Sequence, residues 1–382
     1  MTFKSLVPTG VSRVAGVARR AAFGLLLCCC ATNALAAPLT GLTRITSTPI
    51  FGGSPTVTSD TAYVSVSSEA PGVWAVTDSG SVFTPAPLSP AAPISSLTRV
   101  TEANDGHLYY AVNYGIDTSG LFGGAALYSL SNPSFVPVVW GGDVTHGGVR
   151  RDLVGAGTVD DFIGGGSPVF LLPNGEVSPM ELPDGSAGAV YSATPNGYAI
   201  GSAVVPMTIG NAPAVWDPEG RFRFVETAGS PVSIRDRADG QGVNIGLFSG
   251  FDIIYGDQPP IELRGPNSDF PYSGFPIVTE GDFVVVAPEL GNDYYAFYPG
   301  IIPGTTDRMR PLLEVFPQLS ALDNLVVSGA TSMGGNVYLT IRAADGLYLF
   351  GAPDPSLIPE PTTAALCCGL LVGASLRSRA RA

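Results

Sequence analysis

The stretch Asp105-Gly106-His107-Leu108-Tyr109-Tyr110-Ala111-Val112 decides the fold, because a turn is followed at once by a strand-forming run. Asp and Gly suit a tight hairpin turn, and aromatic and β-branched residues favour a strand. The same order returns six more times. Its strands are marked by Tyr63, Tyr109, Leu153, Tyr198, Val243, Phe283 and Val337, which lie 46, 44, 45, 45, 40 and 54 residues apart. A period near 45 residues is typical of a four-stranded propeller blade.

A second strand-like run follows each of these, at residues 73–76, 127–130, 169–172, 214–216, 253–255, 296–298 and 347–350. A turn and a third run come next in several units, as in Pro218-Glu219-Gly220-Arg221-Phe222. No long helical pattern appears. The sequence therefore predicts an all-β protein, a seven-bladed β-propeller over residues 38–352. A pair of β-sandwiches or a β-solenoid is the alternative.

The last unit is predicted to end without an outer strand, because a Pro-rich linker at residues 353–358 follows Phe350. Near the start of the chain, Leu42-Thr43-Arg44-Ile45-Thr46 resembles an outer strand and echoes Leu97-Thr98-Arg99-Val100-Thr101. We expect residues 42–46 to complete the last blade. Such closure would remove the exposed edges through which open sheets aggregate.

The N-terminus has the features of a secretory signal peptide, assigned to residues 1–37. Four basic residues precede an apolar run at residues 21–30, and an A-x-A site follows. Cleavage is expected at this site, which is formed by Ala34, Ala36 and Ala37. Export through the Sec translocon is predicted, with a twin-arginine route at Arg19-Arg20 as the alternative.

The C-terminus combines a Pro-Glu-Pro motif, an apolar run at residues 362–376 and a basic tail. The motif is Pro359, Glu360 and Pro361, and the tail carries Arg377, Arg379 and Arg381. This order resembles the PEP-CTERM sorting signal, here residues 359–382. The resemblance implies processing by an exosortase, a membrane enzyme, in a bacterium that makes extracellular polysaccharide. An ordinary C-terminal anchor is the alternative.

The apolar run of about 15 residues is at the short limit for a transmembrane helix. The arginines would stay on the cytoplasmic side. Both terminal signals predict an exported protein of the cell envelope, the outer surface or the extracellular space, anchored transiently in the inner membrane.

Two stretches of the repeat region also resemble known extracellular repeats. Residues 212–222, with Trp216 and Gly220, are similar to HAF-type repeats, and residues 42–53 to a phrase found in PEP-CTERM proteins. The resemblance implies no established enzymatic activity.

Charge and cysteine usage narrow the function classes. All five cysteines lie in the terminal segments, so the domain between them has no disulfide and no thiol chemistry. Twelve arginines and no lysine face 32 acidic residues between Leu39 and Glu360, a formal charge of −20. Such a surface would repel nucleic acid and anionic polysaccharide.

The sequence offers no clear catalytic constellation. His107 and His146, the two histidines, are interpreted as turn or loop residues without metal-ligand spacing. Asp160-Asp161 is interpreted as a solvated loop. Glu280 with Asp282, and Asp236 and Asp239 with Arg235 and Arg237, are interpreted as ordinary salt pairs in turns. A cation in the central channel stays open, although no cofactor is predicted.

The three tryptophans are the remaining candidates for a ligand surface. Trp74 and Trp216 are predicted to pack between blades, and Trp140 either in the core or on the surface.

These observations predict a non-catalytic, surface-associated propeller that binds or supports extracellular polysaccharide or envelope proteins. One alternative is a glycan-active hydrolase or lyase whose carboxylates lie on one propeller face. Glycosidases need two carboxyl groups about 5–9 Å apart. Another is a carbohydrate-binding module with an exposed aromatic platform.

Overall fold

The structure is a computed structural model, and it describes residues 39–357 except 69, 88–91, 116–122, 161–165, 184–185, 205–210, 226–229, 241, 249–251, 257, 265–273, 289–292 and 300–308. The chain divides into two compact units, Met1–Pro38 and Leu39–Ala382. All described residues belong to the second unit. The expected signal peptide and the expected sorting signal therefore lie outside the described residues.

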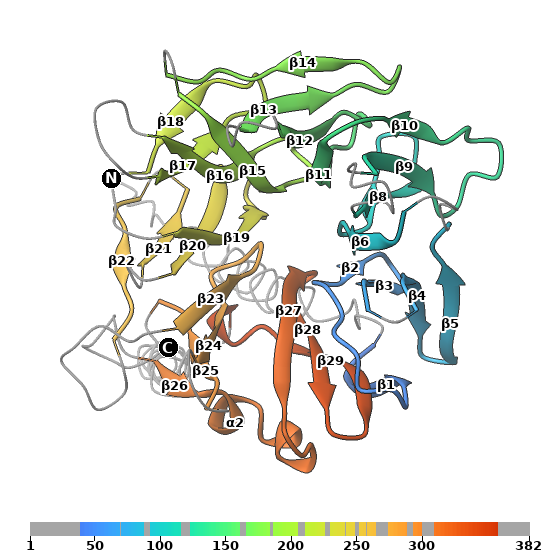
Figure 1. The fold of residues 1–382 in the computed structure, drawn as a ribbon. Coiled ribbons are helices and arrows are strands. Elements are labelled where there is room, and N and C mark those ends of the chain that lie inside the picture. The colour runs from blue at the N-terminus through green and yellow to red at the C-terminus, as the bar shows by residue number, and fades with distance from the viewer. Residues whose placement is uncertain are drawn as a thin grey trace, which may run out of the picture. The chain divides into compact units, whose positions relative to one another are not determined.

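The described strands form seven antiparallel sheets arranged as the blades of a β-propeller (Figure 1). From channel to rim, the first blade consists of β2 (Thr56–Val57), β3 (Ala62–Val66), β4 (Gly72–Thr77) and β5 (Gly80–Pro85). The third consists of β11 (Val144–Val149), β12 (Gly155–Asp160), β13 (Gly166–Leu171) and β14 (Val177–Pro179). The fourth consists of β15 (Gly188–Ala193), β16 (Ala199–Val204), β17 (Asn211–Trp216) and β18 (Phe222–Phe224). The fifth blade consists of β19 (Ser230–Asp236), β20 (Val243–Phe248), β21 (Asp252–Tyr255) and β22 (Ile261–Glu262). The sixth consists of β23 (Gly274–Val278), β24 (Val284–Pro288), β25 (Tyr295–Phe297) and β26 (Arg310–Pro311).

The second and seventh blades depart from this simple order. In the second, β6 (Ile94–Leu97) and β7 (Thr101–Glu102) share the inner edge of β8 (Leu108–Tyr114), and β9 (Ala125–Ser129) and β10 (Val138–Trp140) follow. The seventh consists of β27 (Val326–Met333), β28 (Asn336–Ala343), β29 (Gly346–Pro353) and β1 (Gly41–Thr46). The predicted seven-bladed, all-β fold is confirmed.

The recurrent turn-and-strand pattern of the sequence is the second strand of every blade. It corresponds to β3, β8, β12, β16, β20, β24 and β28, and the run after it is the third strand. All seven residues of β8 are buried. Because blades pack on both faces of such a strand, its sequence is nearly all apolar instead of alternating.

Ring closure follows the expected scheme. β1 pairs with β29 in antiparallel register, with Leu42 opposite Phe350 and Thr43 opposite Leu349. The first described strand is thus the outer strand of the last blade. Residues 97–101, which echo residues 42–46, instead lie on the inner side of the second blade, where β6 and β7 pair with β8. The pairing edge that is available, and not the local sequence, decides which role each segment takes.

Buried polar side chains join neighbouring blades. The Asn113 side chain on β8 accepts a hydrogen bond from the His146 backbone N–H at 2.7 Å and donates one to the His146 carbonyl at 2.9 Å. Thr158 on β12 accepts from the Val190 N–H at 2.8 Å. The inner strands β6, β11, β15, β19 and β27 each carry a bulge. The Asn113 and Thr158 side chains thus satisfy backbone groups of the next blade's inner strand, which would otherwise be buried without partners.

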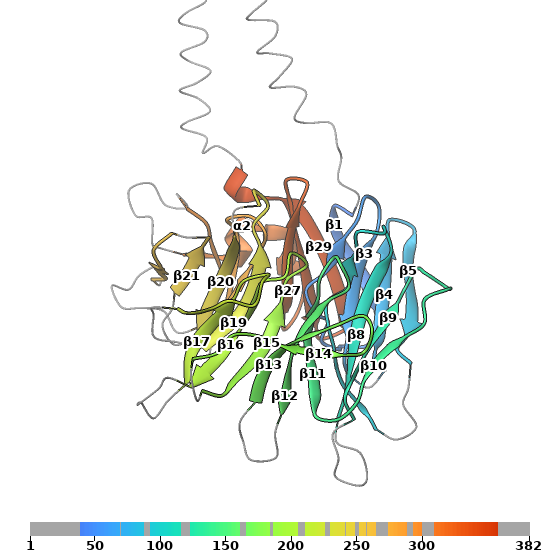
Figure 2. The ribbon, with the colours of Figure 1, turned by 90° about the horizontal axis from the view of Figure 1, so that it is seen from above.

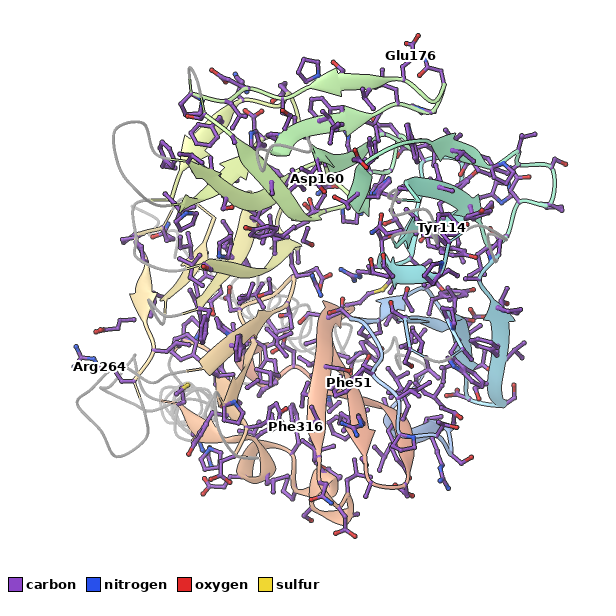
Figure 3. All side chains as sticks on the ribbon, viewed as in Figure 1. Phe51, Tyr114, Asp160, Glu176, Arg264 and Phe316 are labelled. Carbon is purple, nitrogen blue, oxygen red and sulfur yellow. The ribbon has the colours of Figure 1, made fainter. Side chains whose placement is uncertain are left out.

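The hydrophobic core is a series of clusters between adjacent blades. Between the sixth and seventh, Phe283 and Phe350 pack with Phe316, which is supplied by the short connection of α2 (Leu312–Val315) and η1 (Pro317–Ala321). Figure 3 shows Phe316 inside this layer, whereas Glu176 and Arg264 lie on the outer rim.

The segment expected to be a linker is partly packed against the ring. β29 extends to Pro353, and η2 (Pro355–Leu357) follows. The Asp354 side chain is 2% exposed and accepts hydrogen bonds from the Ser356 N–H and hydroxyl group at 2.9 and 2.6 Å. Strands run between the two ends of the ring (Figure 2). The antiparallel order brings the end of β29 and the start of β1 to the same end.

Candidate functional site in the central channel

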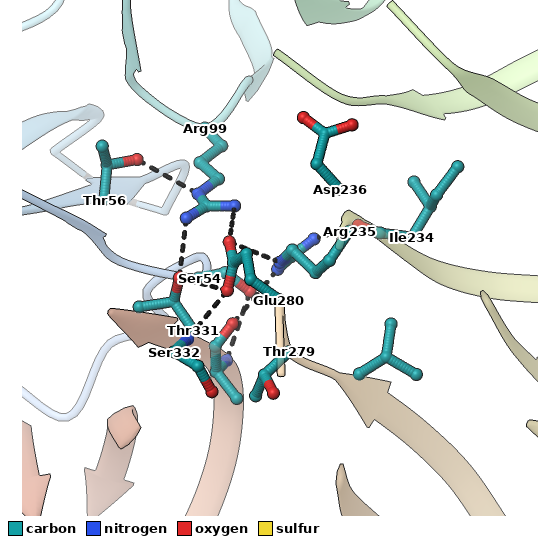
Figure 4. Close-up of polar contacts among 12 residues, drawn as sticks. Ser54, Thr56, Arg99, Ile234, Arg235, Asp236, Thr279, Glu280, Thr331 and Ser332 are labelled. Atoms are coloured by element: carbon teal, nitrogen blue, oxygen red, sulfur yellow. Dashed lines mark hydrogen bonds and ion pairs between the residues drawn. The ribbon is translucent and has the colours of Figure 1, made fainter. Parts of the chain in front are cut away.

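Charged side chains from several blades converge where the inner strands end. Arg99 lies between β6 and β7, Arg235 lies on β19, and Glu280 follows β23. Thr331 on β27 joins them. Figure 4 shows both guanidinium groups directed at the Glu280 carboxylate. We call Arg99, Arg235, Glu280 and Thr331 the channel cluster.

Arg99 is the most fully bonded cation of the channel cluster. Its Nη1 donates to Glu280 Oε1 at 2.8 Å, its Nη2 to Thr331 Oγ1 at 2.8 Å, and its Nε to Thr56 Oγ1 at 3.1 Å. The other carboxylate oxygen, Glu280 Oε2, accepts from the Thr331 hydroxyl group and from the Ser332 N–H, each at 2.7 Å. One carboxylate thus connects the second, sixth and seventh blades.

Arg235 is mostly buried and has weaker partners than Arg99. Its side chain is 11% exposed, and its Nε lies 3.9 Å from Glu280 Oε1. Nη1 donates to the Ile234 carbonyl at 2.6 Å, and Nη2 to the Ala330 carbonyl at 3.4 Å. Burial lowers the pKa of Arg235 to about 10, and the nearby charge of Arg99 acts in the same direction. The group remains cationic at neutral pH.

The Glu280 carboxylate is held as an anion. Burial raises its pKa, but Arg99, Arg235, the Ser332 N–H and the Thr331 hydroxyl group outweigh burial, so the pKa lies below its ordinary value. A general acid needs the opposite shift. The interpretation of Glu280 and Arg235 as members of turn salt pairs is therefore wrong, because both side chains turn into the channel.

The neighbouring charges do behave as turn pairs. Arg237 contacts Asp239 at 2.6 Å and Asp282 at 3.6 Å, near the surface. Asp236, by contrast, is buried: its Oδ2 accepts from the Asn196 N–H at 2.9 Å, and its Oδ1 has no hydrogen-bond partner among the described residues. Desolvation by burial raises the pKa of Asp236.

A narrow cavity of about 50 Å³ adjoins the channel cluster. It is lined by Arg99, Thr101, Gly147, Gly148, Val149, Ser192, Ala193, Thr194, Pro195, Ile234 and Arg235. These residues belong to the inner sides of the second to fifth blades. Arg99 and Arg235 are thus both among the residues that border a small space in a domain whose overall charge is strongly negative.

His146 is not the loop residue that the sequence predicts. It lies on β11, is 3% exposed, and packs edge-on against Trp140, with 5.4 Å between ring centroids. Its Nδ1 accepts from the Gly148 N–H at 3.1 Å. Desolvation by burial lowers the pKa of His146 to about 3. The flanking glycines serve close packing: a Cβ at Gly148 would collide with the Ala193 carbonyl of the next blade.

The other sequence candidates are dispersed. His107 lies in the hairpin before β8, as expected, and Asp160 ends β12, while Asp161 is outside the described residues. Trp140 and Trp216 are buried, and Trp74 is half-buried against Phe83. Within the described ranges, no group of three or more His, Cys, Asp or Glu residues could hold a metal ion.

The expected terminal sites have no structural description. Ala34, Ala36, Ala37, Pro359, Glu360, Pro361, Arg377, Arg379 and Arg381 all lie outside the described residues, as does the expected transmembrane helix. Among the described residues, no helix has the length and apolarity needed to cross a membrane.

Sequence reasoning missed the channel cluster as a unit. Arg99, Arg235 and Thr331 each stand shortly before a recurrent hairpin turn. In an alignment of the repeats, these three residues share a position near the end of the inner strand. A charged or hydroxyl side chain at this position is the sequence signal for the channel cluster.

Comparison with known proteins supports the fold. No family model matches the sequence, and no curated protein matches it. Among solved structures, the chain is similar to the β-propeller domain of Cps50 (Swd1) from Myceliophthora thermophila, with 10% identity, a TM-score of 0.51, and coverage of 80% of this chain and 97% of that one. More distant similarities are to TolB from Acinetobacter baumannii (13% identity, TM-score 0.37, coverage 92% and 72%) and to a gluconolactonase from Xanthomonas campestris (12%, 0.40, 84% and 93%).

Proposed function

We propose that this protein is an exported, surface-associated β-propeller that acts by binding and not by catalysis. Its terminal segments serve export and exosortase-dependent sorting, and its propeller presents binding surfaces to the envelope or the extracellular matrix. The partners are extracellular polysaccharide or envelope proteins.

One observation carries the non-catalytic part. Glu280, the buried carboxylate of the channel cluster, accepts hydrogen bonds from Arg99, Thr331 and Ser332 and has a lowered pKa. A carboxylate fixed in this way neither donates a proton near neutral pH nor has a free face for a substrate proton. The resemblance of residues 359–382 to a sorting signal carries the export part.

Sorting is tested by the intact mass of the protein recovered from its host. We expect loss of the N-terminal segment after Ala36 or Ala37, and loss of the C-terminal segment at the Pro-Glu-Pro motif. Replacing Pro359, Glu360 and Pro361 by alanine should preserve the C-terminal segment. The matched control replaces Thr362 and Thr363 by alanine, just outside the motif. Loss of the C-terminal segment from both variants would contradict the sorting role.

Asp236 gives the glycan-active alternative its one support, since a buried carboxyl group with a raised pKa is a typical acid catalyst. Its side chain is 9% exposed, however, and does not line the cavity. The full chain should release no reducing ends from acidic or neutral polysaccharides. Turnover that is abolished by Asp236→Asn or Glu280→Gln, but not by Asp239→Asn, would replace the binding function with an enzymatic one.

A further inference from the structure

The channel cluster contains more positive charge than it neutralises. Arg99 and Arg235 both face Glu280, and this one carboxylate approaches Arg99 at 2.8 Å but Arg235 only at 3.9 Å. Asp236, which follows Arg235 in the chain, also attracts Arg235 electrostatically, but its carboxylate accepts a hydrogen bond from the Asn196 N–H of the preceding blade. A buried charge without full compensation is costly, so an additional anion beside Arg235 would be favourable.

Hydrogen-bond donors in the channel cluster are also in excess. A guanidinium group carries five N–H donors. Arg99 uses three of them, toward Thr56, Glu280 and Thr331. Arg235 uses two, toward the Ile234 and Ala330 carbonyls, and its buried Nε has no hydrogen-bond partner in the described part of the chain. Buried donors are almost always satisfied, by protein, water or ligand.

The cavity that both arginines line has the size of a small anion. At about 10–15 Å³ for each water, its volume of about 50 Å³ has room for a few water molecules. The four oxygens of one tetrahedral oxyanion need similar space, whereas a pyranose ring does not fit. Thr101, Ser192 and Thr194 add polar side chains to the walls.

We propose that this cavity binds a small free tetrahedral oxyanion, such as phosphate or sulfate, between the guanidinium groups of Arg99 and Arg235. Planar guanidinium groups bind such oxygens through paired, charge-assisted hydrogen bonds. This inference deepens the proposed binding role and rests on it for its biological meaning. Calorimetry on the isolated protein does not depend on sorting, so either proposal can fail without the other.

The test is isothermal titration calorimetry of the full chain with sodium phosphate, sodium sulfate and sodium glucuronate at constant ionic strength. We expect saturable binding of phosphate and sulfate, and at least tenfold weaker binding of glucuronate, whose sugar ring exceeds the cavity. Arg235→Met should weaken phosphate binding at least tenfold. The matched control, Arg221→Met, removes the same charge from an exposed hairpin and should leave the affinity unchanged within about twofold.

Two further measurements keep the proposal falsifiable if Arg235→Met does not fold. Arg235→Lys retains the charge but loses the planar fork, and should bind phosphate with intermediate affinity. In the unmodified protein, phosphate should shift the Nε–H resonance of Arg235 in proportion to occupancy. No saturable binding of phosphate or sulfate, tighter binding of glucuronate, or an unshifted Arg235 resonance at saturation would each overturn the proposal.

Discussion

Arg99 and Glu280 stand 181 positions apart in the sequence and meet across the channel with 2.8 Å between Nη1 and Oε1. Arg99 belongs to the second blade and Glu280 to the sixth, so the pair joins blades that are not neighbours in the ring. Most other contacts in a propeller connect adjacent blades. The ion pair therefore links distant parts of the ring.

Removing the Glu280 charge should destabilise the protein strongly. Glu280→Gln leaves two mostly buried guanidinium groups without their shared carboxylate, and breaking a buried pair costs about 3–5 kcal/mol, so we expect a loss toward the lower end of that range. The matched control is Glu219→Gln, which removes an exposed partner of Arg221 and should cost less than about 1 kcal/mol. Urea unfolding at pH 7 measures both free energies. Similar losses in the two variants would show that the channel pair adds no more than a surface pair.

Asn113 should be a second sensitive position, because its side chain bonds both backbone groups of His146 in the next blade. Asn113→Ala leaves a buried N–H and a buried C=O without partners, and we expect a loss of about 2–4 kcal/mol in the free energy of unfolding. Asn174→Ala, in the exposed hairpin before β14, is the control and should cost less than about 1 kcal/mol. The comparison fails if the two variants unfold at the same urea concentration.

The sequence predicted the fold because the decisive information is local. Each blade begins its second strand at a turn, as at Asp105-Gly106 before β8, and that strand is nearly all apolar because both faces are covered. The period of these units follows from the amount of chain that one blade needs. Closure by β1 could also be predicted, since the last unit had too few strands and the first segment was left over.

The channel cluster could not be predicted in the same way. Arg99, Arg235, Glu280 and Thr331 come from different repeats, and only the closed ring brings them together. In the sequence, Glu280 stands beside Asp282 in a turn-like segment, which made a surface salt pair the simpler interpretation. Side-chain direction at the end of an inner strand depends on the register and bulges of that strand, which local residues do not reveal.

His146 illustrates a different limit. Glycines on its C-terminal side suggested a turn, but Gly147 and Gly148 lie in a bulged strand, where the next blade approaches too closely for a side chain. A glycine needed for close packing and a glycine needed for a turn have the same sequence signature.

Closure of the ring by β1 should be essential to stability. Ile45 is 4% exposed, so Ile45→Asp places an unpaired charge at a buried position of β1, the outer strand of the last blade, and removes apolar burial worth about 1.5–3 kcal/mol. We expect a total loss of about 3 kcal/mol or more, and faster amide hydrogen exchange in β29. Leu42→Asp on the same strand is the control, because Leu42 is already exposed. Protected β29 amides in Ile45→Asp would mean that the last blade does not need β1.

The protein should become less stable as the pH decreases through a window set by His146. Burial lowers its pKa to about 3 from the ordinary 6.5, so the unfolded chain binds a proton that the folded chain does not bind. Above pH 6.5, His146 therefore does not make the free energy of unfolding depend on pH. Below pH 6.5, the free energy of unfolding decreases by up to about 1.4 kcal/mol per pH unit as the pH approaches 3. Between pH 6.5 and 4.5 the effect is separable from that of Glu280, whose ordinary pKa is 4.5 and is lowered further in the fold.

Trp140, Asn113 and Gly148 contact His146 and carry no charge, and desolvation by burial is what lowers its pKa and sets this window. His146→Gln should be less stable at pH 7, but its free energy of unfolding should vary less between pH 6.5 and 4.5. His107→Gln, at the exposed hairpin, should keep the slope of the unmodified protein. Urea unfolding at four pH values in this window measures all three slopes. An unchanged slope in His146→Gln would show that another group causes the acid sensitivity, and that His146 is protonated equally in both states.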